Sequence, residues 1–421
     1  MFDLVIKEVR LLSSDDIVDI AIKDGVIEKI GQIDEPCQQL IQGERRLLLP
    51  PYVESHIHLD TALTSGKPAV NHSGELFEGI QLWNQYRQTM TYEDVVNRAL
   101  EVIKTMAAQG VLYMRSMVDT SDPELTALRA LLDVKETVSS FMTLQLVGFP
   151  QNGLSSKEGK EQLKQAIELG VDGISAVPHL EATREKGIQS VETCYQLALE
   201  HDCFVHIFCD EIDDGQSRFL EVVADFAIET GLKERVTVSH INAMSYYEEA
   251  YVRKLMGLLQ ASKINVVTAP LISTAMQGRL DSWPKGRGMT RVKDLHQAGI
   301  TVAVAHDDFL SPFYPLGTGS LLSAGHLLLH LAHMTGADDF DAVLNMITTK
   351  PASVLELKGY GIKERNEANL ILVSATNAHD LLRRQPVAEV VISKGEMLAE
   401  TTRPQTVFYS NLNQVREEVE Q

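Results

Sequence analysis

One stretch decides the fold: residues 53–58, which read Val-Glu-Ser-His-Ile-His and follow the turn at Pro50-Pro51. Its composition is typical of a β-strand, and its two histidines stand two positions apart. Because alternate residues of a strand point to the same side, His56 and His58 can share one divalent ion. Two histidines at this spacing also pair for purely structural reasons, so the interpretation depends on the rest of the chain.

Working outward, apolar strands alternate with amphipathic helices between about residues 48 and 355. This alternation is typical of a parallel α/β architecture, and eight candidate strands are the number that a (β/α)8 TIM-like barrel needs. Helices are predicted where apolar residues recur every three or four positions, at 92–106, 159–169 and 217–227. The predicted strands are 53–58, 111–115, 144–149, 173–177, 204–208, 236–240, 264–268 and 301–307.

Both ends of the chain have a different texture, with short β-rich runs between turn residues. We expect the two ends to meet in a small β-sandwich domain into which the barrel is inserted. The predicted division is 1–49 and 356–421 for this composite β-domain, and 50–355 for the barrel. The runs themselves are 4–12, 17–22, 26–30, 369–373, 387–395 and 406–409.

The net negative charge of the chain disfavours anionic partners such as nucleic acid and membranes. The 421 residues carry a formal net charge of −20, and lysine and arginine form no long block, so we expect neither nucleic acid nor a membrane as a partner. The four cysteines include no C-x-x-C pair, which favours a reducing compartment. With no signal-peptide core and no apolar run of membrane-spanning length in the sequence, the expected location is the cytoplasm.

Ligand-type residues follow several of the predicted strands, at the end where a (β/α)8 barrel places its active site. The fifth strand carries His206 and leads into Glu211, the sixth ends at His240, and the eighth leads into 306–308 (His-Asp-Asp). Each alone is more often structural. Four such strand ends at one mouth favour a metal-dependent active site, in which a partly desolvated Glu211 holds a proton near neutral pH.

Six longer motifs resemble those of bacterial cytosine deaminases, within the amidohydrolase superfamily. The likeness extends over almost the whole chain and is far more specific than the histidine pair alone. These motifs are 56–66, 149–153, 178–185, 209–219, 277–285 and 306–317.

This resemblance implies roles for individual residues. His56, His58 and Asp307 would bind one divalent metal ion, iron or zinc, and the absence of lysine from the fourth strand favours a single ion. Glu211 would handle the proton at the ring nitrogen, and His240 would stabilise the attacking hydroxide, whose proton Asp307 takes. The substrate would contact Gln151, Leu63, Asp308 and Phe313, with the Gln151 amide matching the carbonyl and N–H of a cyclic amide.

The sequence departs from the family pattern next to the expected metal. Phe208 stands where the family has a metal-binding histidine, and Met117 stands where it has a second histidine. His206 shares the strand face of Phe208 about 6 to 7 Å away, so it reaches the ion only through a bulge. We predict that His206 is the fourth ligand; the alternative is that it is a core histidine and Phe208 fills a vacated position. Phe313, where relatives have tryptophan, predicts a reshaped substrate pocket.

The predicted function is that of a metal-dependent deaminase, with a small nucleobase-like molecule as its substrate. Hydroxide activated by the metal would attack a cytosine-like pyrimidine or related cyclic amidine and release ammonia. Two alternatives remain open: a hydrolase that removes an amino or alkylamino group from a triazine- or purine-like ring, and a catalytically weakened homologue that binds a ligand without turnover. The resemblance also implies a homo-oligomer.

Overall fold

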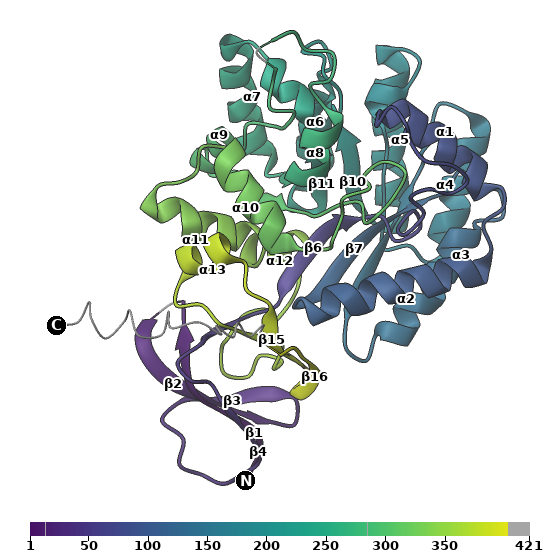
Figure 1. The fold of residues 1–421 in the computed structure, drawn as a ribbon. Coiled ribbons are helices and arrows are strands. Elements are labelled where there is room, and N and C mark those ends of the chain that lie inside the picture. Colours follow the sequence, from purple (N-terminus) through teal and green to yellow (C-terminus); the bar gives the residue numbers. More distant parts are fainter. Residues whose placement is uncertain (13, 284, 403–421) are drawn as a thin grey trace, which may run out of the picture.

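The computed structural model describes residues 1–12, 14–283 and 285–402. Two sheets organise this part of the chain, a barrel sheet surrounded by helices and a second sheet at one end of it (Figure 1). The predicted strand at 406–409 lies outside the described residues. No helix in the described ranges is long and apolar enough to cross a membrane.

The barrel sheet contains eight strands, each hydrogen-bonded in parallel to the next along the chain. All eight predicted barrel strands are therefore confirmed, although the fourth is only two residues long. Between the last and first strands, the Glu54 carboxylate accepts hydrogen bonds from the backbone N–H groups of His56 (2.9 Å) and His306 (2.8 Å). The strands are β6 (Tyr52–Ile57), β7 (Val111–Asp119), β8 (Thr143–Phe149), β9 (Gly173–Ile174), β10 (Phe204–Cys209), β11 (Val236–His240), β12 (Asn265–Thr268) and β13 (Val302–Val304).

Amphipathic helices cover the outside of the barrel (Figure 1). Helix α2 (Tyr92–Ala108) is an example: the Thr91 side chain caps its first turn by accepting from the Asp94 N–H, and Val95, Val102 and Met106 are fully buried. The other helices of the barrel region are α1 (Leu76–Arg87), α3 (Thr126–Val138), α4 (Lys157–Leu169), α5 (Arg184–His201), α6 (Phe219–Thr230), α7 (Glu249–Ser262), α8 (Pro270–Met276), α9 (Val292–Gln297), α10 (Leu321–Leu331), α11 (Ala337–Met346) and α12 (Thr349–Val354), and α13 (Ala378–Arg384) follows near the C-terminus.

The second sheet joins the two ends of the chain, as the sequence predicted. Its central contact is the antiparallel pairing of β5 with β14, which hydrogen-bonds the N-terminal strands to the C-terminal ones. Strands β4, β5 and β16 were not predicted. In the described residues all eight strands belong to one hydrogen-bonded sheet, and they are β1 (Phe2–Leu11), β2 (Ser14–Lys23), β3 (Val26–Gly31), β4 (Cys37–Gln42), β5 (Leu47–Leu49), β14 (Leu370–Val373), β15 (Ala388–Ser393) and β16 (Glu396–Glu400).

Candidate active site

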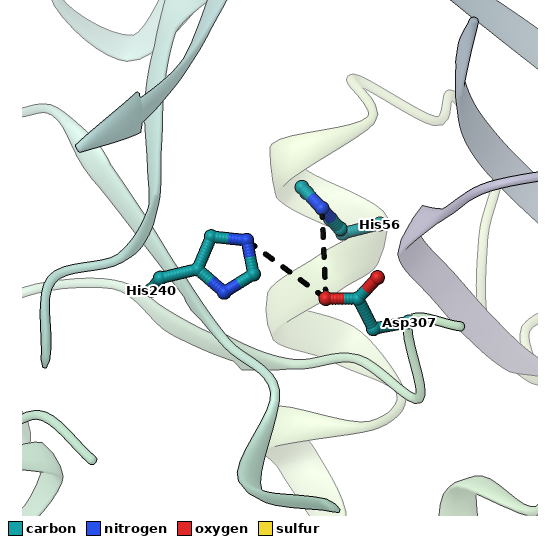
Figure 2. Close-up of side chains that lie close together, drawn as sticks. All are labelled: His56, His240 and Asp307. Carbon is teal, nitrogen blue, oxygen red and sulfur yellow. Dashed lines mark ion pairs between the residues drawn. The ribbon is translucent and has the colours of Figure 1, made fainter. Parts of the chain in front are cut away.

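Three buried side chains from distant parts of the chain meet at the C-terminal ends of the barrel strands (Figure 2). His56 lies on β6, His240 is the last residue of β11, and Asp307 follows β13. Oδ2 of Asp307 is 3.8 Å from Nε2 of His56 and 3.8 Å from Nε2 of His240. We call these three residues the ligand cluster.

The backbone at two of these residues is in an uncommon conformation. His240 has φ = 70° and Asp307 has φ = 71°, in the left-handed region that residues other than glycine rarely adopt. Such conformations cost free energy and tend to occur at functional sites, where the surrounding structure holds them in place. The chain therefore sustains local strain to aim both side chains into the barrel mouth.

Several polar atoms of the ligand cluster are buried without a hydrogen-bond partner. Within the described residues these atoms are Nε2 of His56, both ring nitrogens of His240 and Oδ1 of Asp307. Buried polar atoms are normally hydrogen-bonded, because an unpaired one costs about 1 to 3 kcal/mol. Imidazole nitrogens and a carboxylate oxygen converging on one point are the donor set that a divalent transition metal takes. The residues present therefore fit a metal ion.

The shifted pKa values of the ligand cluster also favour a bound metal ion. Burial lowers the pKa of His240 to about 3 and holds the pKa of His56 well below its usual value, so both rings are neutral and have a lone pair available. Burial, followed by repulsion from Asp308 and Glu211, raises the pKa of Asp307 well above its usual value. A cation among these groups would relieve the repulsion between the carboxylates.

His58 extends the ligand cluster on one side. Its Nε2 is 3.9 Å from Oδ1 of Asp307, and its Nδ1 is 3.9 Å from Oδ1 of Asp60. Asp60 is itself held in place, because its carboxylate accepts from the backbone N–H of Asp119 at 2.8 Å. The Trp83 indole donates to Asp119 in turn, at 2.9 Å. A carboxylate behind a histidine ligand is a common way to orient the ring.

Glu211 faces the ligand cluster from the end of β10. Its Oε1 is 3.7 Å from Nδ1 of His240, and burial together with the charge of Asp308 raises its pKa to about 8. The turn that carries it is anchored by Asp210, whose carboxylate accepts from the backbone N–H groups of Phe219 (3.0 Å) and Leu220 (2.9 Å) at the start of α6. Glu211 is thus a half-buried carboxylic acid with a raised pKa, which favours its protonated form near neutral pH.

A cavity opens beside these groups and contains most of the predicted substrate contacts. Gln151, Asp308 and Phe313 line it, whereas Leu63 is not among the described residues that do. The Leu63 backbone N–H instead donates to the Phe309 carbonyl at 2.9 Å. The predicted site residues in the lining are His58, Gln151, Glu211, His240, Asp307, Asp308 and Phe313, joined by Phe208, Phe149 and His179.

Phe208 and His206 occupy different levels of the barrel. The Phe208 ring lines the cavity, where it stacks on Phe149 at 4.2 Å and meets the His56 ring edge-on at 4.7 Å. His206 lies behind His56, with its Nε2 3.0 Å from Nδ1 of His56. This places His206 against the nitrogen of His56 opposite to the one that faces Asp307. The assignment of His206 as a metal ligand stays a prediction that this placement does not support.

Comparison with known proteins adds to this geometry. Residues 91–399 match the amidohydrolase family. The chain belongs to the amidohydrolase family. It is therefore a hydrolase of a metal-dependent superfamily, as its motifs predicted.

Individual relatives of this amidohydrolase act on nitrogen heterocycles. The crystal structure of 5-methylcytosine deaminase from Klebsiella pneumoniae, liganded with 5-fluorocytosine, superposes with a TM-score of 0.93 at 41% identity, covering 96% of this chain and 99% of that one. N-isopropylammelide isopropyl amidohydrolase of Pseudomonas sp. is 25% identical over 94% of this chain and 97% of its own length. Pterin deaminase of Rhizobium rhizogenes is 24% identical over 90% and 87%, respectively.

Sequence reasoning missed two buried residues of the site. The Glu54 carboxylate links β6 to the segment after β13 by accepting hydrogen bonds from the backbone N–H groups of His56 and His306. On β7, Nη1 of Arg115 lies 3.3 Å from Nδ1 of His206. Residue alternation was a usable signal for Glu54, since it stands two positions before His56 and thus on the same strand face. No comparable signal marked Arg115, because its partner is 91 residues away in the chain.

Proposed function

We propose that this amidohydrolase deaminates a cytosine-like pyrimidine, with 5-methylcytosine and cytosine as the first candidates, and releases ammonia. The observation that carries the proposal is the placement of Glu211, an acid whose pKa is raised to about 8, beside the unpartnered atoms of the ligand cluster and in one cavity with Gln151. The 41% identical 5-methylcytosine deaminase supports the choice of ring.

In this proposal His56, His58, His240 and Asp307 would hold one divalent ion, iron or zinc. A divalent ion bound there lowers the pKa of water enough to make it a nucleophile at neutral pH. Asp307 is placed to accept a proton, because its Oδ1 has no hydrogen-bond donor among the described residues. The His240 ring lies beside both acids of the site, with Nε2 3.8 Å from Oδ2 of Asp307 and Nδ1 3.7 Å from Oε1 of Glu211.

The substrate is oriented by groups of the cavity wall. Gln151 offers both a donor and an acceptor, which match the adjacent carbonyl and N–H of a pyrimidine ring. The stacked pair Phe149 and Phe208 presents an aromatic surface to a flat ring. Glu211 donates its proton to the ring nitrogen as water adds to the neighbouring ring carbon, and it recovers a proton from the added hydroxyl group. The proton that Asp307 accepts from the water passes to the amino group, which leaves that carbon as ammonia.

The test is a panel of substrates scored by release of ammonia or amine. We expect 5-methylcytosine and cytosine to be hydrolysed, with N-isopropylammelide and pterin inert or far slower. Preferential release of isopropylamine from N-isopropylammelide would replace this proposal with the alkylaminohydrolase alternative. No turnover of any compound by metal-loaded protein would favour the weakened, ligand-binding homologue.

A further inference from the structure

Beneath the ligand cluster, three buried side chains form a hydrogen-bonded series that we call the buried chain: Arg115, His206 and His56. Nη1 of Arg115 is 3.3 Å from Nδ1 of His206, and Nε2 of His206 is 3.0 Å from Nδ1 of His56. The exposed fractions of these residues are 2%, 0% and 0%. The far nitrogen of His56, Nε2, faces Asp307.

Arg115 is held in one place by several further contacts. Its Nε donates to the Gln145 side chain at 2.9 Å, and its Nη2 donates to the Val354 carbonyl at 2.9 Å. The guanidinium also lies over the Phe204 ring, 4.0 Å from its centre, and Nη1 is 3.4 Å from Oγ1 of Thr237. A guanidinium anchored in this way cannot easily turn away from His206.

The direction of the hydrogen bonds follows from the chemistry of the three groups. A guanidinium only donates, so Nδ1 of His206 must accept. A neutral His206 then carries its proton on Nε2 and donates to Nδ1 of His56. His56 in turn carries its proton on Nε2, the nitrogen that faces Asp307.

A metal ion requires the opposite arrangement at His56, because a ligating nitrogen has no proton. With Nε2 bound, the His56 proton moves to Nδ1 and is donated to Nε2 of His206. The His206 proton must then lie on Nδ1, directed at the Arg115 donor. Each ring keeps one proton throughout, so the change is a reversal of two tautomers without net uptake or loss of protons.

We propose that Arg115 and His206 are positioning residues that orient His56, and that occupation of the metal site reverses the tautomers of His56 and His206. In this arrangement His206, which lies one level below Phe208 in the barrel, orients His56 through a hydrogen bond and does not itself bind the ion. Arg115 opposes metal binding, because it loses its acceptor on His206 when the ion binds. This inference rests on the metal site of the proposed function.

Nitrogen-15 NMR of the wild-type protein labelled at histidine tests the tautomers directly, with His206→Gln used to assign its signals. Without metal, we expect His206 and His56 to carry their protons on Nε2. After one equivalent of zinc, both protons should lie on Nδ1. Zinc that binds while either tautomer stays unchanged would overturn the inference and leave the metal site standing. Protein that binds no zinc would overturn the metal site, and this inference with it.

A double-mutant cycle measured by zinc affinity tests the role of Arg115. Arg115→Met should tighten zinc binding about tenfold, the value of one hydrogen bond, and should have no effect in a His206→Phe background. Equal tightening in both backgrounds would show a simple charge effect and contradict the inference. Thr237→Val is the matched control, because it removes a neighbour of the same guanidinium nitrogen but leaves the donor, and it should not change the affinity.

Discussion

Two buried aspartates of this amidohydrolase, one in the second sheet and one at the barrel mouth, differ in how many hydrogen-bond donors their carboxylates have. In the second sheet, Asp19 accepts hydrogen bonds from the Lys7 ammonium and from the backbone N–H groups of Glu8 and Ile33, at 2.9 to 3.1 Å. At the barrel mouth, Oδ1 of Asp307 has no donor within the described residues. The hydrogen bonds to Asp19 outweigh its burial and lower its pKa, whereas burial and neighbouring carboxylates raise the pKa of Asp307.

The difference separates a structural site from a functional one. A carboxylate with three donors stabilises the fold, since its charge is compensated within the protein. A buried carboxylate with one oxygen that lacks a donor destabilises the fold unless something outside the chain compensates it. The barrel mouth is therefore arranged to bind a cation that the chain itself does not supply.

Removal of the uncompensated carboxylate should give the largest effect on activity and little effect on the fold. Asp307→Ala should lower turnover of 5-methylcytosine by a factor on the order of 10³ or more, because a ligand and a proton acceptor are lost together. The melting temperature without metal should stay the same or rise, since a costly buried acid is gone. Asp294→Asn, exposed on α9, is the control. Near-wild-type turnover by Asp307→Ala would refute the proposed mechanism.

The acid at the cavity should affect chemistry without affecting the metal. Glu211→Gln keeps the shape of the side chain but removes the proton, so activity should fall by a factor of about 10² to 10⁴. Metal content per chain, measured after gel filtration, should match the wild type. Glu229→Gln, exposed on α6, should change neither quantity. Loss of metal together with activity would make Glu211 a ligand.

The pKa of Glu211 also predicts a pH dependence. A raised pKa of about 8 means that the acid is protonated, and so able to donate, at lower pH. Activity should therefore fall as pH rises through about 8, and this limb of the kcat/KM profile should move when Asp308→Asn removes a neighbouring charge, toward lower pH. A limb that does not move in Asp308→Asn would show that another group is titrating.

The aromatic at the vacated ligand position should affect affinity more modestly. Phe208→His adds an imidazole among the rings of the ligand cluster, so zinc should bind about tenfold more tightly in an equilibrium titration. Phe149→Leu removes the stack on Phe208 without adding a ligand, and it should leave zinc affinity unchanged. Weaker zinc binding by Phe208→His would mean that the position cannot reach the ion.

The smallest effect is expected at the compensated carboxylate. Asp19→Asn should lower the free energy of unfolding by about 1 to 2 kcal/mol at pH 7, measured with urea. Because folding lowers the pKa of Asp19, its contribution is present above the unfolded pKa of about 4 and is lost as pH falls through the folded value. The difference from wild type should thus shrink below about pH 4, with the exposed Asp34→Asn as control. A pH-independent difference would contradict the assignment.

The barrel mouth was largely predictable from the sequence, because its ligand-type residues follow predicted strands, whereas no sequence pattern marked Asp19. The pairing of His56 with His58, and the acids and histidines after later strands, are enough to indicate the barrel mouth. The meeting of the two termini in one sheet also followed from their shared β-rich texture. The short strand β9 and the helix α1 were less evident, since two residues or a moderately amphipathic segment give little periodic signal.

What the sequence could not show depends on contacts between distant segments. Residue alternation predicted that His206 lies on the same strand face as Phe208. Only the structure shows that Nε2 of His206 is 3.0 Å from Nδ1 of His56, so that the two rings share a hydrogen bond. Leu63 is not among the described residues that line the cavity, and its contact with the substrate stays a prediction. No sequence pattern marked Arg115, since its burial and its partners are properties of the packed barrel.

The unpartnered atoms of His56, His240 and Asp307 are expected to bind a catalytic metal ion. The decisive measurement is the release of ammonia from 5-methylcytosine by chelator-treated protein, before and after one equivalent of zinc or iron(II) is added. We predict negligible activity without metal, recovery that saturates at one ion per chain, and no recovery in Asp307→Ala. Full activity in protein shown to be free of metal, or recovery in Asp307→Ala equal to that of the wild type, would contradict the account.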